Sequence, residues 1–163
     1  MLLRAWRFAT LLLTALAPTM ESAHVLELPQ KLGYAPDLYA AVNGTLYRFF
    51  AIVGGAHQVG SIVLAAILAV LVRGRGPSFG WTVAGAAGLA LAFVVWLAVV
   101  APVNGMVASA LESDPASVPA LWMRLRARWE YRHAVGFVVP LAALSAPLAG
   151  VLVETPARRV PSA

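Results

Sequence analysis

The sequence predicts an all-α integral membrane protein, a four-helix bundle whose neighbouring helices are antiparallel. Its 163 residues are 61% hydrophobic and 12% charged, with a mean hydropathy of +0.80. Soluble domains are about half hydrophobic and about a quarter charged. A soluble domain of this size cannot bury so much apolar surface, whereas a bilayer accommodates it. Four apolar segments joined by short connections supply the spans, and short connections make neighbours antiparallel.

The first apolar segment is short, and it can be a retained helix or a signal peptide. Arg4 and Arg7 precede an apolar run over residues 8–20, which resembles the basic start and short core of a signal peptide. We expect the segment to be retained, because Pro18 closely follows the small residues. In addition, Glu21 stands where a cleavage site needs a small side chain.

As a retained helix, this segment extends to about residue 28 and ends at Pro29, because proline interrupts helical hydrogen bonding. Its outer end carries three ionisable side chains, Glu21, His24 and Glu27. The first span therefore brings acid and base groups into the outer half of the membrane.

Residues 31–43 are rich in turn formers, and we expect a polar connection there on the membrane surface. The second span covers about residues 45–72 and the third about residues 78–103, joined by a tight turn at 74–77. Pro102 ends or kinks the third span. Small residues recur at every fourth position of the third span, which allows helices to approach closely. They are Gly80, Ala84, Gly88 and Ala92.

Residues 106–117 are predicted to form a connection, after which a helix begins near Pro119 and continues as the fourth span. Pro140 and Pro147 lie inside this span, and we expect them to bend it. Together the four spans form a single domain over residues 1–155, followed by a loose tail over 156–163.

Four spans place both termini on one side of the cell membrane. Lysines and arginines tie at six on each side, so their count alone does not orient the chain. The side opposite the termini also carries acidic residues that neutralise its basic ones, so we expect the termini in the cytoplasm. These acids are Glu21, Glu27, Asp37, Glu112, Asp114 and Glu130.

Charge and cysteine content exclude several classes of protein. The net charge of +5 comes from basic residues at the ends of apolar segments, which indicates a lipid bilayer partner and no nucleic acid. The absence of cysteine excludes disulfides and Cys-ligated metals. The spacing of Glu21 and His24 occurs in di-iron bundles, but the second copy that such sites need is missing. We expect no metal and no other cofactor, although the three histidines with Glu27 leave a single-metal site open.

Polar residues from all four predicted helices fall at one level in the outer half of the bundle. All three histidines of the chain, His24, His57 and His133, lie at this level together with Asn104. Polar and ionisable groups at membrane depth are costly and face the bundle interior or a water-filled cavity. Their shared level therefore predicts a pocket between helix ends.

The fourth helix carries the densest part of this constellation. Trp122, Trp129 and His133 share one face, and Arg128 and Arg132 lie beside it. Tryptophan offers a flat aromatic wall, histidine exchanges protons near neutral pH, and arginine stabilises a developing oxyanion. This combination suits a hydrophobic, acidic aromatic small molecule.

Each of these residues also has a structural interpretation. The tryptophans fit an interfacial aromatic belt, and the arginines, with Arg124 and Arg126 foremost, fit a stripe that faces lipid headgroups. His57 fits a packing role, Asn104 fits a cap on a kinked helix, and Glu21 or Glu27 fits a charge partner for an arginine.

Four segments occur in the same order in a known family. They are Glu21-Ser-Ala-His24-Val-Leu-Glu-Leu-Pro29-Gln-Lys31, Leu46-Tyr-Arg48, Pro102-Val-Asn104 and Arg128-Trp129-Glu-Tyr-Arg-His133. The chain thereby resembles the anthrone-oxygenase-like family of small four-helix membrane proteins, most of which are catalogued as a domain of unknown function. The resemblance covers nearly the whole chain, but the His57 position is not part of it.

The resemblance implies a function that some members have, the oxidation of polyketide anthrones to anthraquinones by molecular oxygen without metal or flavin. It casts His133 as the base, Trp129 as an aromatic wall, Asn104 and Arg128 as oxyanion donors, and His24 with Glu27 as an orienting or second-base pair. Glu21, His57, Trp122 and Arg132 are predicted to bind the substrate.

Two other functions compete with this one. A non-catalytic membrane binder or accessory protein for a quinone, lipid or polyketide would use the same pocket. A transporter or proton relay is disfavoured, because the half of the bundle near the termini has almost no polar side chains. Neither the substrate nor the oligomeric state follows from the sequence.

Overall fold

The computed structural model describes residues 1–47 and 49–155, so the predictions for Arg48 and for the tail over 156–163 lie outside the described residues. The described part of the chain is all-helical and contains no strand, as the composition predicted. Its elements are α1 (Leu2–Leu16), α2 (Thr19–Lys31), α3 (Pro36–Thr45), α4 (Phe50–Val72), α5 (Pro77–Ser113), a 3-10 turn η1 (Pro115–Ser117) and α6 (Val118–Glu154).

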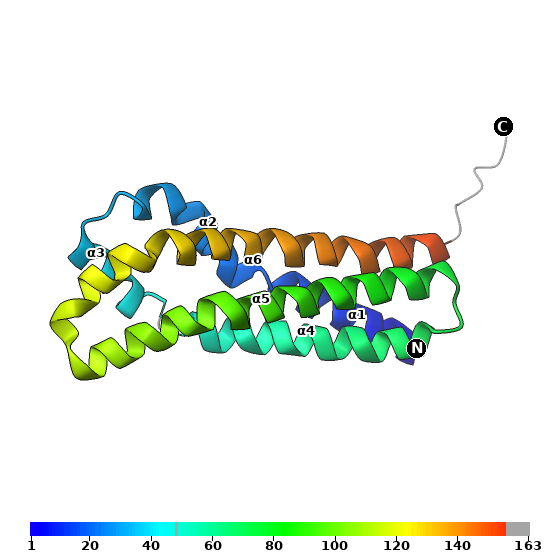
Figure 1. Ribbon diagram of the computed structural model, residues 1–163. Helices are drawn as coiled ribbons and strands as arrows, with labels where there is room; N and C mark the ends of the chain where they lie inside the picture. Colours follow the sequence, from blue (N-terminus) through cyan, green and yellow to red (C-terminus); the bar gives the residue numbers. More distant parts are fainter. Residues whose placement is uncertain (48, 156–163) are drawn as a thin grey trace, which may run out of the picture.

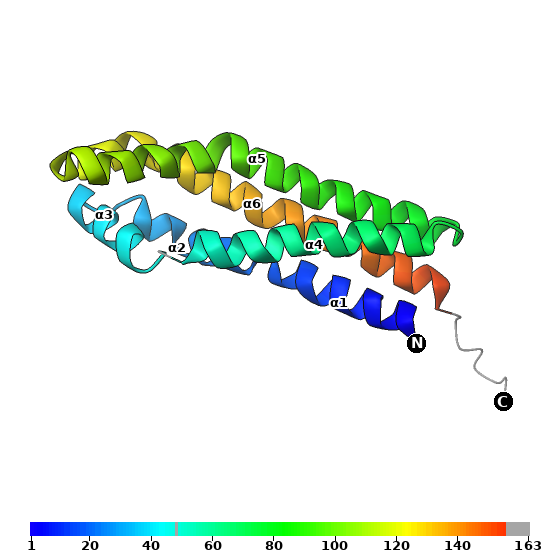
Figure 2. The ribbon, with the colours of Figure 1, turned by 90° about the horizontal axis from the view of Figure 1, so that it is seen from below.

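The long helices α4, α5 and α6 lie side by side, and the chain reverses after α4 and again after α5 (Figure 1). These three, α6 taken with η1, are each long and apolar enough to cross a membrane. α1 packs beside them against α4 and α6 (Figure 2). α2 and α3 lie at the end of the body where α5 turns into α6 (Figure 1). α2 and α3 thus pack mainly against α6 near this end of the long helices.

The first predicted span is not one continuous helix. α1 ends at Leu16 and α2 begins at Thr19, so the helix is interrupted at Ala17 and Pro18. Pro18 causes the break, because proline has no backbone N–H and its ring clashes with the carbonyl one turn earlier. The 15 residues of α1 measure about 22 Å, which is too short to cross a core of about 30 Å.

The helix end predicted at Pro29 was wrong, and of the two alternatives predicted for Pro102, an end or a kink, the end was wrong. Pro29 lies inside α2, which continues to Lys31, and Pro102 lies inside α5, which continues to Ser113. Each proline costs about 3 kcal/mol inside a helix, and the packing of the residues beyond it outweighs that cost. α5 therefore covers most of the predicted connection over 106–117. The predicted connection over 31–43 likewise contains most of α3.

α5 and α6 approach closely at Gly85. A Cβ atom built on Gly85 would lie 2.8 Å from Cδ of Pro147 and 3.0 Å from the carbonyl oxygen of Ala143. The predicted small-residue stripe lies only partly at this contact. Gly88 faces Ala143, whereas nothing lies within 4 Å of a Cβ atom built on Gly80. The packing seam is therefore rotated around α5 relative to the predicted one.

Gly85→Ala is expected to lower the free energy of unfolding by about 1–3 kcal/mol, because the added methyl group must push α6 away. Gly80→Ala is the matched control on the same helix, and it is expected to leave stability unchanged or slightly higher. Thermal unfolding of both variants in detergent micelles measures the difference. Equal midpoints would contradict the close approach at Gly85.

Candidate functional site

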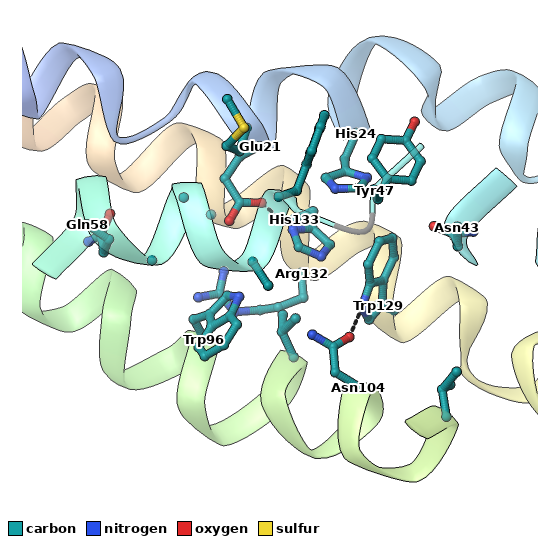
Figure 3. Close-up of a pocket in the computed structure, with 18 of the residues that line it drawn as sticks. Glu21, His24, Asn43, Tyr47, Gln58, Trp96, Asn104, Trp129, Arg132 and His133 are labelled. Carbon is teal, nitrogen blue, oxygen red and sulfur yellow. Dashed lines mark hydrogen bonds and ion pairs between the residues drawn. The ribbon is translucent and has the colours of Figure 1, made fainter. Parts of the chain in front are cut away.

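A cavity of about 330 Å³ lies where α2, α3, α4, α5 and α6 meet (Figure 3). This volume is within the range of small-molecule sites. Most residues that line the cavity are apolar, and a small set of polar and aromatic side chains lies among them. That set includes Glu21, His24, Asn43, Tyr47, Gln58, Trp96, Asn104, Trp122, Trp129, Arg132 and His133.

His133 of α6 is buried, and its Nδ1 pairs with a carboxylate oxygen of Glu21 on α2. A carboxylate accepts hydrogen bonds, so Nδ1 of His133 carries a hydrogen. The other ring nitrogen, Nε2, is buried and has no hydrogen-bond partner within the described residues. Gly136 leaves room for this pair, since a Cβ atom there would lie 3.2 Å from Cδ of Glu21. His133 thus presents an unused acceptor, and its ring is oriented by a carboxylate.

Aromatic rings pack closely around His133. The ring of His24 stacks on it with centroids 4.2 Å apart, and the ring of Trp129 lies 4.1 Å away at a steep angle. Nε1 of Trp129 donates a 3.0 Å hydrogen bond to Oδ1 of Asn104 on α5. Because the indole is only a donor, this bond fixes the orientation of the amide. The Asn104 NH₂ group therefore remains a donor for a ligand.

Arg132 is buried beside His133 and lines the same cavity. Its Nη2 donates a 3.0 Å hydrogen bond to the carbonyl oxygen of Ala92 on α5. Its Nε and Nη1 are buried without a partner in the part of the chain that the structure describes. A buried guanidinium with unused donors suits an anionic or carbonyl oxygen of a ligand, because charge-assisted hydrogen bonds are strong there.

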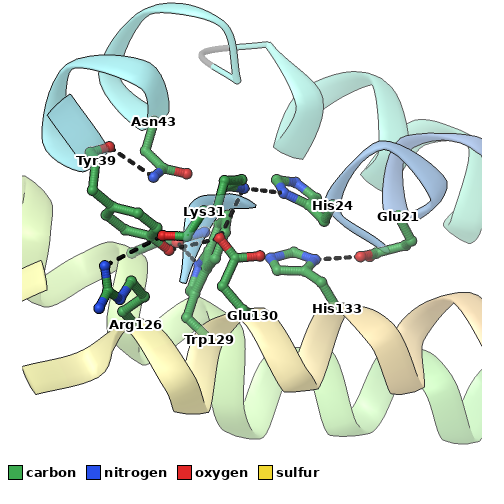
Figure 4. A network of polar contacts seen from close by, with 10 residues as sticks. Glu21, His24, Lys31, Tyr39, Asn43, Arg126, Trp129, Glu130 and His133 are labelled. Carbon is green, nitrogen blue, oxygen red and sulfur yellow. Dashed lines mark hydrogen bonds and ion pairs between the residues drawn. The ribbon is translucent and has the colours of Figure 1, made fainter. Parts of the chain in front are cut away.

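A second polar cluster, Lys31, Tyr39, Arg126 and Glu130, adjoins the cavity (Figure 4). Nζ of Lys31 is fully buried, 2.8 Å from Oε1 of Glu130 and 3.1 Å from Nδ1 of His24. The Tyr39 hydroxyl donates a 2.8 Å hydrogen bond to the same oxygen of Glu130, and Arg126 donates to the backbone carbonyl of Lys31. Burial and the Glu130 carboxylate raise the pKa of Tyr39, so this phenol remains a donor.

Residues 49–146, more than half of the chain, match the family model described as anthrone oxygenase. The chain belongs to the anthrone oxygenase family. No curated protein and no solved structure matches it. The region matched by the anthrone oxygenase model carries Asn104, Trp129 and His133, whereas Glu21 precedes it. The matched region thus supplies the part of the lining that comes from α4, α5 and α6, and the preceding part of the chain, with α2 and α3, supplies the rest.

Most of the site residues predicted for this anthrone oxygenase family protein line the cavity. Their common level on different helices was sufficient to predict that they meet, although the interruption at Pro18 was not foreseen. They are Glu21, His24, Asn104, Trp122, Trp129, Arg132 and His133.

Two arginines of α6 lie elsewhere than predicted. Arg128, the predicted oxyanion donor, is exposed and does not line the cavity, and Arg132 supplies the guanidinium instead. Arg128 lies about 40° further around the helix than Arg132, which places it just outside the buried arc. Arg126, predicted to face headgroups, instead donates to the backbone carbonyls of Lys31, at the end of α2, and of Tyr34, which precedes α3.

Glu27 and His57 also lie outside the cavity lining of the described structure. Glu27 is half-buried, and the polar neighbour of His24 is Lys31, which lies on the same face because the two are seven residues apart. On α4 it is Gln58 that lines the cavity, and His57 points about 100° away from it.

Lys31, Tyr39 and Glu130 were not predicted to be partners in the site. Lys31 was assigned to a surface connection, and Glu130 was counted only as a charge that neutralises its neighbours. The i, i+7 relation between His24 and Lys31 was the available signal. It was overlooked because Pro29 was expected to end the helix between them.

Gly136→Ala is expected to lower the activity of the site without unfolding the protein. The added methyl group would lie 3.3 Å from both carboxylate oxygens of Glu21, so this carboxylate must move away from His133 by a few tenths of an ångström. A misplacement of 1 Å can cost about 10²-fold in rate, so this smaller shift is expected to cost roughly a few-fold. The rate of substrate turnover, compared with Gly80→Ala, measures the effect, and equal rates would contradict a tight pair.

Proposed function

We propose that this protein oxidises a hydrophobic anthrone, or a similarly acidic phenolic compound, with molecular oxygen inside a membrane. Its membership of the anthrone oxygenase family supports this reaction. The observation that carries the proposal is the state of His133, whose Nδ1 is paired with Glu21 and whose Nε2 is unused in an aromatic-walled cavity. A flat substrate would lie against Trp129 and the neighbouring rings.

The first step is removal of a proton from the methylene carbon of the anthrone, and Nε2 of His133 accepts it. The C–H electron pair enters the aromatic system and places negative charge on the substrate oxygen. Glu21 stabilises the imidazolium that forms. The unused donors of Arg132 and the amide of Asn104 are available to stabilise the oxyanion.

Oxygen then oxidises the carbanion. Electron transfer and formation of a C–O bond yield a peroxide, which takes up one proton. Loss of the second methylene proton breaks the O–O bond, releases water and leaves the new quinone carbonyl. One anthrone and one O₂ thereby give one anthraquinone and one H₂O, and the substrate supplies all four electrons that O₂ accepts.

We further propose a multi-pass arrangement in a cell membrane. α1 with α2 forms the first span, and α4, α5 and α6 form three more, so that neighbours are antiparallel within one domain over residues 1–155. The length and hydropathy of the three long helices support their insertion. The acidic residues opposite the termini support a cytoplasmic location for both termini. A hydrophobic substrate would then reach the cavity through the bilayer.

Purified membranes supplied with an anthrone and ¹⁸O₂ test the proposed reaction. We expect one O₂ to be consumed per quinone formed, with one labelled oxygen in the quinone and the other in water. Membranes from cells that lack the protein measure the spontaneous oxidation of the anthrone. A rate no greater than this background would contradict the proposal.

The same preparation separates catalysis from binding. A non-catalytic binder would show quenching of tryptophan fluorescence by the anthrone or the quinone, since Trp129, Trp122 and Trp96 line the cavity. Quenching without labelled quinone would replace the enzymatic proposal by that of a binding or accessory protein.

A further inference from the structure

The two stacked histidines are held by groups of opposite charge. Nδ1 of His133 pairs with the carboxylate of Glu21, and Nδ1 of His24 lies 3.1 Å from the ammonium of Lys31 (Figure 4). A carboxylate only accepts hydrogen bonds, and an ammonium only donates them. His133 must therefore carry a hydrogen on Nδ1, whereas Nδ1 of His24 must be an acceptor. The neutral His24 ring then carries its hydrogen on Nε2.

The surroundings of Lys31 hold it in the ammonium form. Its Nζ lies 2.8 Å from Oε1 of Glu130 and 4.4 Å from the ring centroid of Tyr47. The carboxylate, the Tyr47 ring and Nδ1 of His24 give each of its three hydrogens an acceptor. A neutral amine would leave the fully buried Glu130 carboxylate without a cation, which is strongly unfavourable. Tyr39 donates to the same carboxylate oxygen, Oε1, while Oε2 is buried without a hydrogen-bond partner among the described residues.

We propose that Lys31, held by Glu130, is a positioning residue that makes His24 the hydrogen donor of the cavity, while His133 is its acceptor. Both rings line the cavity, with centroids 4.2 Å apart. A ligand that fits this pair has an acidic C–H or O–H group beside an oxygen that accepts a hydrogen bond. Two histidines whose environments enforce opposite roles form an acid and base pair.

In the oxidation, this arrangement gives every proton a source and a destination. His133 takes the first methylene proton. Nε2–H of His24 protonates the peroxide while Lys31 gives a proton to Nδ1 of His24, which leaves Glu130 without a cation only until that proton returns. His24 then takes the second methylene proton at Nε2 and passes the Nδ1 proton back to Lys31. The imidazolium of His133 protonates the departing hydroxide, which leaves as water. This catalytic part rests on the proposed function, and the tautomer assignment does not.

Nitrogen NMR of the full-length protein, labelled with ¹⁵N-histidine in lipid nanodiscs, tests the tautomers directly, because protonated and unprotonated ring nitrogens resonate far apart. The chain has three histidines, and His57→Asn removes the third set of signals. We expect the Nε2–H tautomer for His24 and the Nδ1–H form for His133. Nδ1–H at His24 in the otherwise unchanged protein would overturn the proposal.

Lys31→Met combined with Glu130→Gln removes both charges of the ion pair together. In this double variant we expect His24 to populate both tautomers, while His133 keeps its form. Tyr39→Phe is the matched control, since it removes one hydrogen bond to Glu130 and keeps the ion pair, and it should retain the original tautomers. An unchanged His24 in the double variant would overturn the role of Lys31.

Measurement of turnover distinguishes a catalytic effect of Lys31 from a purely structural one. We expect the double variant to lower kcat by about 10²-fold with little change in KM, because it removes a general acid and leaves the cavity walls in place. Tyr131→Phe, at an exposed position of α6, is the control. A shifted tautomer with an unchanged kcat would overturn the catalytic part alone. Absence of turnover in the unmodified protein would contradict the proposed function and leave the tautomer result valid.

Discussion

Replacing His133 with alanine is expected to lower kcat for anthrone oxidation by about 10²- to 10⁴-fold, the usual contribution of a general base. The unused Nε2 is the group that the reaction loses, while the walls formed by Trp129 and His24 remain to bind the substrate. KM is therefore expected to change little. Initial rates of quinone formation in nanodiscs over a range of anthrone concentrations measure both quantities.

His57→Ala is the matched control for this prediction, because it makes the same change at a histidine that does not line the cavity. Its kcat is expected to stay within a few-fold of the original. The pair of His133 and Glu21 provides a second check. Glu21→Ala should lower kcat less than His133→Ala does, and the double variant should be no slower than His133→Ala alone, because the two residues act as a unit. If the losses in kcat of the two single variants combined in the double variant, the two residues would not act as a unit.

Glu130→Ala is expected to lower the free energy of unfolding by about 3–5 kcal/mol. The substitution leaves the Lys31 ammonium, which is 0% exposed, without its counter-charge, and it also removes the acceptor of the Tyr39 hydroxyl. A buried charge that loses its partner pays the full cost of desolvation. Denaturant unfolding in mixed micelles, followed by tryptophan fluorescence, measures the loss.

Two variants locate the origin of this effect. Glu112→Ala makes the same change at an exposed position of α5 and is expected to stay within about 0.5 kcal/mol of the original stability. Lys31→Met combined with Glu130→Leu removes the pair as a whole, and it should recover most of the loss because no charge is left alone. If the double variant were as unstable as Glu130→Ala, the loss of stability would come from packing and not from the unpaired charge.

The helices were predictable because long apolar runs have few alternatives in a chain of this composition. Their ends were not, since a proline signals an end only where nothing downstream favours continuing. Pro18 does interrupt the helix, whereas Pro29 and Pro102 do not, and in both of those cases the following residues are packed against other helices. Local propensity cannot distinguish these cases without the tertiary contacts.

The level of the site was predictable, and its angular arrangement was not. Counting along each helix placed His24, Asn104 and His133 at one depth, but the choice between Arg128 and Arg132 depends on about 40° of helical rotation. The neighbouring helix decides which of the two arginines enters the cavity, because the carbonyl of Ala92 on α5 accepts a hydrogen bond from Arg132. Only three-dimensional packing supplies that information.

The buried pair of Lys31 and Glu130 also sets an order for biogenesis. Lys31 leaves the ribosome well before Glu130 is synthesised, because α4 and α5 lie between them in the chain. An ammonium without its carboxylate is too costly to bury, so α2 is expected to stay hydrated at the membrane surface during that interval. The site then closes last, when α6 arrives, and a chain truncated before Glu130 would leave α2 and α3 without the helix against which they mainly pack.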